Sequence, residues 1–239
     1  PAASRRLRLL ESTAMKEPFS LGPRLSLCAR LLRPGRPMAD IGTDHGYLPI
    51  WLLRTGAAPR AIACDINPGP LEAARKHAEM YGVKLRLVLS DGLSAISPED
   101  AEDIVIAGMG GELILRIIDG APWVKCTDKN IVLQPMSAAD KLRIGLWERG
   151  FNVQKELAAM ENGKVYSAFS VRYKGELGEM GSIYPYMGRL ESGTSEVSAY
   201  AKKTLRGIKN SLQGAEHNDN SEEARRLREV VEGIEREYL

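Results

Sequence analysis

The sequence predicts a doubly wound α/β fold with a mainly parallel sheet, followed by a helical hairpin. Between residues 38 and 173, short apolar runs alternate with stretches whose apolar residues recur at helical spacing. After residue 188 the apolar residues change to a spacing close to a heptad. The chain has 239 residues, 44% hydrophobic and 27% charged, which is enough for one full domain and an appendage.

The first expected element is a helix near the amino terminus. Leu21, Leu25, Cys28 and Leu31 recur at helical spacing, and the Pro-Gly pair at 34–35 ends the pattern. We expect residues 1–20 to be an extension that precedes the first domain.

Five strands and four helices are expected in the next stretch. Most of the apolar runs lead into glycine or aspartate, which is typical of strands buried on both faces of a parallel sheet. Strands are predicted at 38–41, 61–64, 85–89, 104–107 and 130–133, and helices at 48–54, 68–81, 112–118 and 138–149.

Two β-rich runs, 151–157 and 165–172, complete this domain. They meet near Asn162 and Gly163, a pair that favours a tight hairpin turn. The predicted sheet therefore ends in a late antiparallel edge, and the domain spans residues 21–175.

A helical hairpin is expected over residues 186–239, after a glycine-rich link at 175–181 and a break at 184–186. A polar turn at 214–220 separates its two apolar seams. The seams contain Leu190, Val197, Ala201, Thr204, Ile208 and Leu212 before the turn, and Leu227, Val230 or Val231, Ile234 and Tyr238 after it.

Composition excludes several classes of protein. Three isolated cysteines without a CxxC pair argue against a disulfide scaffold or a zinc–thiolate site, and three scattered histidines suggest no metal. No uncharged run approaches the roughly 18 residues of a membrane span, and no apolar leader with a cleavage site is evident. We expect a cytoplasmic protein without membrane contacts.

The segment after the first predicted strand is the most informative. In a doubly wound sheet, ligands bind at the carboxyl ends of the strands, and Gly42 lets the backbone approach a ligand closely. The loop reads GxxxG instead of the dinucleotide pattern GxGxxG, and carries Asp40 and Asp44. Carboxylates disfavour a pyrophosphate but suit a ligand with sulfonium and ammonium groups, such as S-adenosylmethionine. A plain strand–helix turn is the alternative.

Acidic residues after the next two strands extend this site. Asp65 lies 23 positions after Gly42, where a carboxylate can accept hydrogen bonds from ribose hydroxyls; capping of the following helix is its alternative role. Asp91 and Gly92 follow the third strand, where an adenine amino group can be bound, although Asp-Gly also marks many turns.

Three segments together resemble the signature set of bacterial TrmK-type tRNA (adenine-N1) methyltransferases. They are DIGTDHGYLP at 40–49, AGMGG at 107–111 and LQP at 133–135. The resemblance, which runs from about Leu21 to Leu239, implies a Rossmann-like class I SAM-dependent methyltransferase domain joined to a C-terminal coiled coil. It also implies methylation of N1 of an adenosine in the D-arm of tRNA, the adenine(22)-N(1) type of activity.

The loop after the fourth strand must present the methyl acceptor. Gly108, Met109, Gly110 and Gly111 provide close backbone approach and no side-chain acceptor for an exocyclic amino group, which fits a ring nitrogen. A glycine-rich helix entry needed only for packing is the alternative. Gln134 and Pro135 either supply an amide to a base edge or end the fifth strand.

No general base is needed, because adenine N1 is unprotonated near neutral pH, and in-line positioning is expected to provide most of the acceleration. A nearby carboxylate can stabilise the positive ring that forms, and Asp44 is the candidate. The predicted catalytic set is Asp44, Met109, Gly110, Gln134 and Pro135. The predicted cofactor-binding set is Asp40, Gly42, Thr43, His45, Gly46, Asp65, Ile66, Asn67, Asp91, Gly92 and Gly108.

Basic side chains provide candidate contacts to tRNA, although the net charge of the chain is only +2. Residues 1–36 carry eight basic against two acidic residues, and a stripe of four cations is predicted on the first helix of the hairpin. A solvated surface is the alternative for both. The N-terminal set is Arg5, Arg6, Arg8, Lys16, Arg24, Arg30, Arg33 and Arg36; the stripe is Lys202, Lys203, Arg206 and Lys209.

Two other functions stay open, and a third is disfavoured. The fold suits a methyltransferase of a small molecule or protein, and a tRNA-binding protein without catalysis. A nicotinamide-dependent dehydrogenase is disfavoured by the missing glycines. The oligomeric state is left open between a monomer and a weak dimer.

Overall fold

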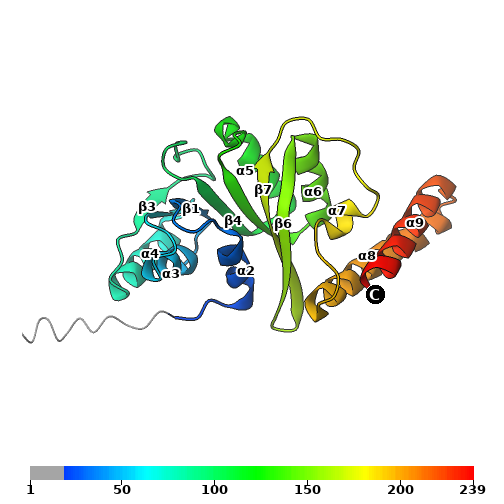
Figure 1. The fold of residues 1–239 in the computed structure, drawn as a ribbon, viewed down its shortest axis with the longest axis horizontal. Coiled ribbons are helices and arrows are strands. Elements are labelled where there is room, and N and C mark those ends of the chain that lie inside the picture. Colours follow the sequence, from blue (N-terminus) through cyan, green and yellow to red (C-terminus); the bar gives the residue numbers. More distant parts are fainter. Residues whose placement is uncertain (1–18) are drawn as a thin grey trace, which may run out of the picture.

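The computed structural model describes residues 19–239, in which a seven-stranded sheet is covered by helices on both faces (Figure 1). The strand order is β3-β2-β1-β4-β5-β7-β6, as expected of a doubly wound methyltransferase-like sheet with an antiparallel edge. The strands are β1 (Met38–Ile41), β2 (Ala61–Asp65), β3 (Arg86–Leu89), β4 (Asp103–Gly110), β5 (Asn130–Ser137), β6 (Phe151–Glu161) and β7 (Lys164–Tyr173). The helices are α2 (Pro23–Leu31), α3 (Tyr47–Arg54), α4 (Pro68–Met80), α5 (Gly111–Asp119), α6 (Ala139–Glu148), α7 (Tyr184–Met187), α8 (Ser195–His217) and α9 (Ser221–Tyr238).

The first five strands run parallel, so their carboxyl ends lie along one edge of the sheet. β1 pairs with β2 and β4, β2 with β3, and β4 with β5, all in parallel register. β7 is antiparallel to both β5 and β6. The loops that the sequence analysis identified as the candidate site follow these carboxyl ends, so they all lie at this edge of the sheet.

Alternate residues of the central strands fill two apolar layers. Ile104 and Ile131 pack on one face with α5 and α6, whereas Val105 and Val132 pack on the other with α2 and α3. Burial on both faces explains why these strands read as continuous apolar runs.

The β6–β7 hairpin is longer than predicted, because both strands continue to its turn. Asn162 and Gly163 have φ values of 50° and 72°, the left-handed pair that a tight type I′ turn requires. The predicted turn is therefore confirmed.

Two predicted strand ends are wrong. Gln134 and Pro135 lie inside β5 and do not end it, and Met109 and Gly110 belong to β4. The two strands stay paired through register shifts at Met109, so the pairing of Met109 with Pro135 and of Gly110 with Ser137 extends the sheet beyond its apolar run.

The C-terminal hairpin differs from the prediction at its turn. Helix α8 continues through Gly214 to His217, so the turn comprises only Asn218–Asn220, and Asn220 caps α9 by accepting from the Glu223 amide. Leu190 is buried but precedes the helix, and the predicted break at 184–186 is a short helix, α7. Tyr200 and Leu205 take seam positions that the heptad reading missed.

A buried ion pair joins the hairpin to the sheet. Arg143 of α6 donates to Glu156 of β6 at 2.5 Å and to the Tyr200 hydroxyl of α8 at 3.1 Å, and both charged side chains are fully buried. Arg143 also donates to the carbonyl of Pro185 in α7 at 2.8 Å. The guanidinium therefore connects α6 with three other elements, β6, α7 and α8, around the start of the hairpin.

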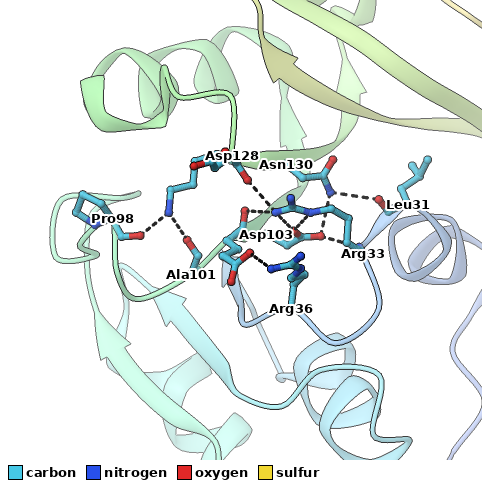
Figure 2. Close-up of polar contacts among 10 residues, drawn as sticks. Leu31, Arg33, Arg36, Pro98, Ala101, Asp103, Asp128 and Asn130 are labelled. Atoms are coloured by element: carbon cyan, nitrogen blue, oxygen red, sulfur yellow. Dashed lines mark hydrogen bonds and ion pairs between the residues drawn. The ribbon is translucent and has the colours of Figure 1, made fainter.

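A second polar network closes the opposite, amino-terminal ends of β4 and β5 (Figure 2). Asp103 accepts from the Arg33 backbone N at 2.7 Å, from Arg33 Nε at 2.6 Å and from Asn130 Nδ2 at 3.0 Å. Arg36 forms a neighbouring ion pair with Glu102 at 2.8 Å.

These contacts change the reading of the N-terminal basic residues. Arg33 and Arg36 hold carboxylates of the fold, and Arg24 lies 3.6 Å from Glu161, so they do not form the free basic face that was expected. Arg5, Arg6, Arg8 and Lys16 lie outside the described residues.

Within residues 19–239, no helix has the length and apolar character needed to cross a bilayer. The same part of the chain contains no cluster of three potential metal ligands.

Candidate functional site

The loop after β1 is fixed by β2. The backbone N–H groups of Gly42 and Thr43 both donate to the Cys64 carbonyl, at 2.8 and 2.9 Å. Thr43 Oγ1 donates to Asp40 Oδ2 at 2.7 Å, inside the protein. The loop therefore holds a buried carboxylate directly below its turn.

Asp40 has an unusual protonation equilibrium. Burial raises the pKa of its carboxyl from 3.8 to about 6, the Thr43 hydrogen bond opposes that rise, and the nearby charge of Asp65 adds to it. A buried carboxylate next to a second carboxylate disfavours an anionic ligand and is stabilised by a cationic one.

Asp65 ends β2 and is only 9% exposed. Its Oδ1 accepts from the Asn67 backbone N at 3.0 Å, so it orders the turn into α4, whose N-cap residue is Asn67 itself. The neighbouring Ile66 side chain is 59% exposed and provides an apolar surface beside the carboxylate.

The loop after β3 adds Asp91 and Gly92. Gly92 has a φ of 56°, and a Cβ there would lie 3.0 Å from Ile117, so both backbone conformation and packing favour glycine. Ser90 braces the same loop by donating to the Gly92 carbonyl at 3.0 Å. Asp91 is exposed.

The end of β4 lies against the loop after β1. Gly42 has a φ of 71°, and a Cβ on it would lie 2.2 Å from the Met109 Cε. The turn assigned to the cofactor and the turn assigned to the methyl acceptor are therefore in direct contact, as reaction between two bound molecules requires.

Close packing also explains the glycines that follow. A Cβ at Gly111 would lie 2.4 Å from the Ala138 carbonyl oxygen, and one at Gly110 would lie 3.2 Å from Ser137 Oγ. Gly108 has a φ of 77°. The structure thus supports the packing role for Gly111. Gly108 and Gly110 add no side chain of their own, and a Cβ at Gly108 would lie 3.5 Å from Arg24 Nη1.

Gln134 braces this loop from within β5. Its side chain is fully buried, and Oε1 accepts from the Gly108 backbone N at 3.1 Å and from Arg24 Nη1 at 2.9 Å. Nε2 donates to the Pro135 carbonyl at 3.0 Å. The amide is therefore committed to the protein, contrary to the expectation that it meets a base edge.

Arg24 was placed among the candidate tRNA contacts by the sequence analysis, which missed its bond to Gln134. Arg24 comes from α2, 110 positions before Gln134, and no local motif marks it. Sequence spacing carries no signal of a contact made only by tertiary packing.

Asp44 and His45 form the exposed part of the loop, with side chains 75% and 48% accessible, and lie 3.5 Å apart. The His45 carbonyl contacts His77 Nδ1 at 2.9 Å, and the His45 ring lies 5.7 Å from that of Tyr47. Gly46 is the N-cap of α3 in left-handed conformation, where a Cβ would lie 2.9 Å from the Ala74 Cβ.

The predicted site residues thus lie at the ends of successive parallel strands, β1 to β5. Comparison with known proteins agrees with this arrangement, since the methyltransferase domain family matches residues 21–169. A tRNA (adenine(22)-N(1))-methyltransferase of Bacillus subtilis (strain 168) is 34% identical over 150 residues, which are 62% of this chain and 63% of that protein.

Solved structures extend the match into the hairpin. A Streptococcus pneumoniae protein assigned as a tRNA (m1A22) methyltransferase, in complex with S-adenosyl-L-methionine, has a TM-score of 0.73 and 30% identity, covering 87% of this chain and 98% of that one. The Bacillus subtilis m1A22 tRNA methyltransferase TrmK has a TM-score of 0.64 and 26% identity, covering 90% and 96%.

Fold, site and matches define the class of this protein: it belongs to the methyltransferase domain family. Within that class, the chain belongs to the TrmK family of tRNA (adenine-N1) methyltransferases. The alignment with the curated Bacillus relative spans 63% of that protein's length.

Proposed function

We propose that this protein transfers a methyl group from S-adenosylmethionine to N1 of an adenosine in the D-arm of tRNA, the adenine(22)-N(1) reaction. The observation that carries the proposal is the direct contact between an acid-lined loop after β1 and the glycine-rich loop after β4, at Gly42 and the Met109 side chain. The named activity of the Bacillus relative supports it.

The residues present fit S-adenosylmethionine. Gly42 has a φ of 71° and no side chain, so its backbone is open to close approach, and Asp40 places a buried carboxylate under that turn. Asp65 and Ile66 offer a ribose acceptor and an apolar surface for a purine. Thr43, His45, Gly46, Asn67, Asp91, Gly92 and Gly108 complete the proposed cofactor-binding set.

The main catalytic contribution of the protein is to hold the methyl donor and the adenine N1 in line. When bound, S-adenosylmethionine supplies an electrophilic methyl group, and a neutral ring nitrogen needs no base to accept it. Gly108 and Gly110 allow the base to approach, while Gln134 and Pro135 hold that loop in place through β5. Asp44 is our candidate for stabilising the cationic product ring.

We also propose a separate role for each of the two parts of the chain. Residues 21–175 form the methyltransferase domain, and residues 186–239 form a hairpin that contacts tRNA through the α8 cations Lys202, Lys203, Arg206 and Lys209. Of these, Lys209 lies 2.6 Å from Glu235, so we assign it the smallest share. A tRNA substrate implies a cytoplasmic location.

The decisive experiment incubates the purified protein with S-adenosylmethionine and unmodified tRNA transcripts, then maps modified adenosines by mass spectrometry. We expect one N1-methyladenosine in the D-arm. Methylation of only a small molecule or a protein would support the alternative methyltransferase, and tRNA binding without turnover would indicate a non-catalytic protein.

A further inference from the structure

Two adjoining cavities lie between parts of the β6–β7 hairpin and α8. The larger has a volume of about 450 Å³ and reaches from Pro135 to α8, and the smaller, about 360 Å³, lies under the β6–β7 turn. Both are lined by Met136, Tyr166 and Lys203, so the two cavities adjoin at these side chains, and we describe them together as one groove. Each is large enough to enclose part of a nucleotide.

The groove begins where the methyl acceptor must lie. Pro135 and Ser137 line the larger cavity, and they pair in register with Met109 and Gly110 of the acceptor loop. A strand of RNA whose target base is held at Gly110 therefore has its neighbouring nucleotide at the entrance of this groove.

The far end of the groove carries unneutralised positive charge. The smaller cavity is lined by Lys164, Lys203 and Arg206 and by no acidic residue. Among the described residues, none of the three forms an ion pair with a carboxylate, and Lys203 Nζ donates only to the Val165 carbonyl at 3.2 Å.

Several other cations of the hairpin have their charge compensated: Lys209 pairs with Glu235, Arg226 with Glu223, and Arg228 with Glu216. Lys202, Arg225 and Arg236 form no ion pair among the described residues either, but they do not line the two cavities. The smaller cavity is distinguished because three unpaired cations meet there without a carboxylate, which favours an anionic occupant.

The groove also presents the ring of Tyr166, which stacks on no other aromatic ring within residues 19–239. Tyr166 is half-buried on β7 and lines both cavities, beside the exposed Met136 and Met160 side chains. An aromatic face next to unpaired cations is the arrangement that binds single-stranded nucleic acid, in which bases stack and phosphates are neutralised. An acidic peptide would use the cations but not the ring.

We propose that this flanking-nucleotide groove, formed by Met136, Lys164, Tyr166, Lys203 and Arg206, binds the unpaired nucleotide next to the target adenosine. Its base stacks on Tyr166, and its phosphates contact Lys164, Lys203 and Arg206. The inference rests on the proposed tRNA methylation and adds the subsite that holds the substrate strand after the target base leaves the stack.

Charge reversal tests the phosphate contacts. The Lys164→Glu/Arg206→Glu double variant should weaken binding of an unmodified tRNA transcript by about tenfold or more, and reduce the salt dependence of binding by about 1.4 in log–log slope. The dissociation constant for S-adenosylmethionine should stay unchanged. Lys174→Glu is the matched control, since Lys174 is an exposed lysine just beyond the other end of β7 and should change tRNA affinity less than twofold.

Two further variants and a crosslink test the stacking. Tyr166→Ala should raise the KM for tRNA about tenfold, and Tyr166→Phe should restore it, because only the ring is required. A photoreactive benzoylphenylalanine at position 166 should crosslink within two nucleotides of the methylated adenosine.

The inference is overturned if the wild-type protein methylates tRNA while the double variant retains its tRNA affinity and salt slope, or if the crosslink maps elsewhere on the tRNA. Failure of the wild-type protein to methylate any tRNA would instead reject the proposed function itself. The two failures are therefore distinguishable in one set of measurements.

Discussion

At the scale of single residues, Asp40 combines burial with a charge that the proposed ligand requires. Its folded pKa of about 6 lies above its ordinary value of 3.8, so the folded protein binds this proton more tightly than the unfolded chain. Its contribution to stability is greatest below pH 4 and is lost as the pH rises through 6. Asp40→Asn should therefore raise the free energy of unfolding at pH 7.5 by about 2–3 kcal/mol and leave it unchanged at pH 4, measured by urea unfolding.

The same residue links pH to ligand binding. A cationic ligand needs the charged carboxylate, so the affinity of the wild-type protein for S-adenosylmethionine should fall as the pH is lowered from 7 to 5. Calorimetry of Asp40→Asn should show weaker binding that no longer depends on pH in this range. Retained pH dependence in the variant would assign the effect to another group.

Gly42 allows the contact between the two loops to be tested. Gly42→Ala places a Cβ 2.2 Å from the Met109 Cε, and Gly56→Ala is its control, since Gly56 has the same φ of 71° with no atom within 4 Å. Both variants should lose about 1 kcal/mol of stability from backbone strain. Only Gly42→Ala should also lose methyl transfer, by about tenfold or more, in assays with labelled S-adenosylmethionine. Equal activity of the two variants would contradict the contact's role.

The sequence predicted the places of Asp40, Gly42 and Asp65 at strand ends, because strand, turn and acid follow one another along the chain. Their roles in binding a cofactor stay predictions. The commitment of Gln134 to Gly108 and Arg24 depends on three separate elements, and no spacing rule reports it.

At the scale of elements, β4 and β5 were predicted from their apolar runs and therefore ended too early, whereas the predicted ends of β1 and β3 agree with the structure. β4 and β5 continue past their apolar residues because Met109 pairs with Pro135 through a register shift, a cross-strand effect. Helix α8 passes through Gly214 because apolar residues on both sides, such as Ile208 and Ala215, pack against α9, and this packing outweighs the weak helix propensity of glycine.

The start of the hairpin depends on a hydrogen bond that only the tertiary structure reveals. Tyr200→Phe removes the hydroxyl that Arg143 Nη2 reaches at 3.1 Å, so that this buried donor keeps Glu156 and only a long contact of 3.5 Å to Ser167 Oγ. We expect a loss of about 1–2 kcal/mol in the free energy of unfolding. Tyr173→Phe is the control, since the Tyr173 ring packs on Phe151 at 5.6 Å, and it should cost under about 0.5 kcal/mol. Similar losses in the two variants would show that the hydroxyl of Tyr200 has no special part.

At the scale of the whole molecule, one end of the parallel sheet carries the candidate site and the other end is a stabilising polar network. The carboxyl ends carry the acid-lined and glycine-rich loops, whereas the amino ends of β4 and β5 are closed by the Asp103 network (Figure 2). The topology could be predicted because alternating strand and helix patterns determine a doubly wound sheet. The network could not, because it joins residues that are 70 and 27 positions from Asp103.

This separation predicts opposite effects of variants at the two ends. Asp103→Ala removes a side chain that is 1% exposed and leaves the Arg33 backbone N without its partner, so it should cost about 2–4 kcal/mol of stability. Glu102→Ala, its neighbour, removes only a solvent-exposed pair with Arg36 and should cost under about 1 kcal/mol.

Below its unfolding temperature, Asp103→Ala should bind S-adenosylmethionine as the wild type does, whereas Asp65→Ala should bind it at least about tenfold more weakly with a smaller loss of stability. Weaker ligand binding by folded Asp103→Ala would mean that the amino-terminal ends also shape the site, because the rigid strands would then transmit the disturbance from one edge of the sheet to the other.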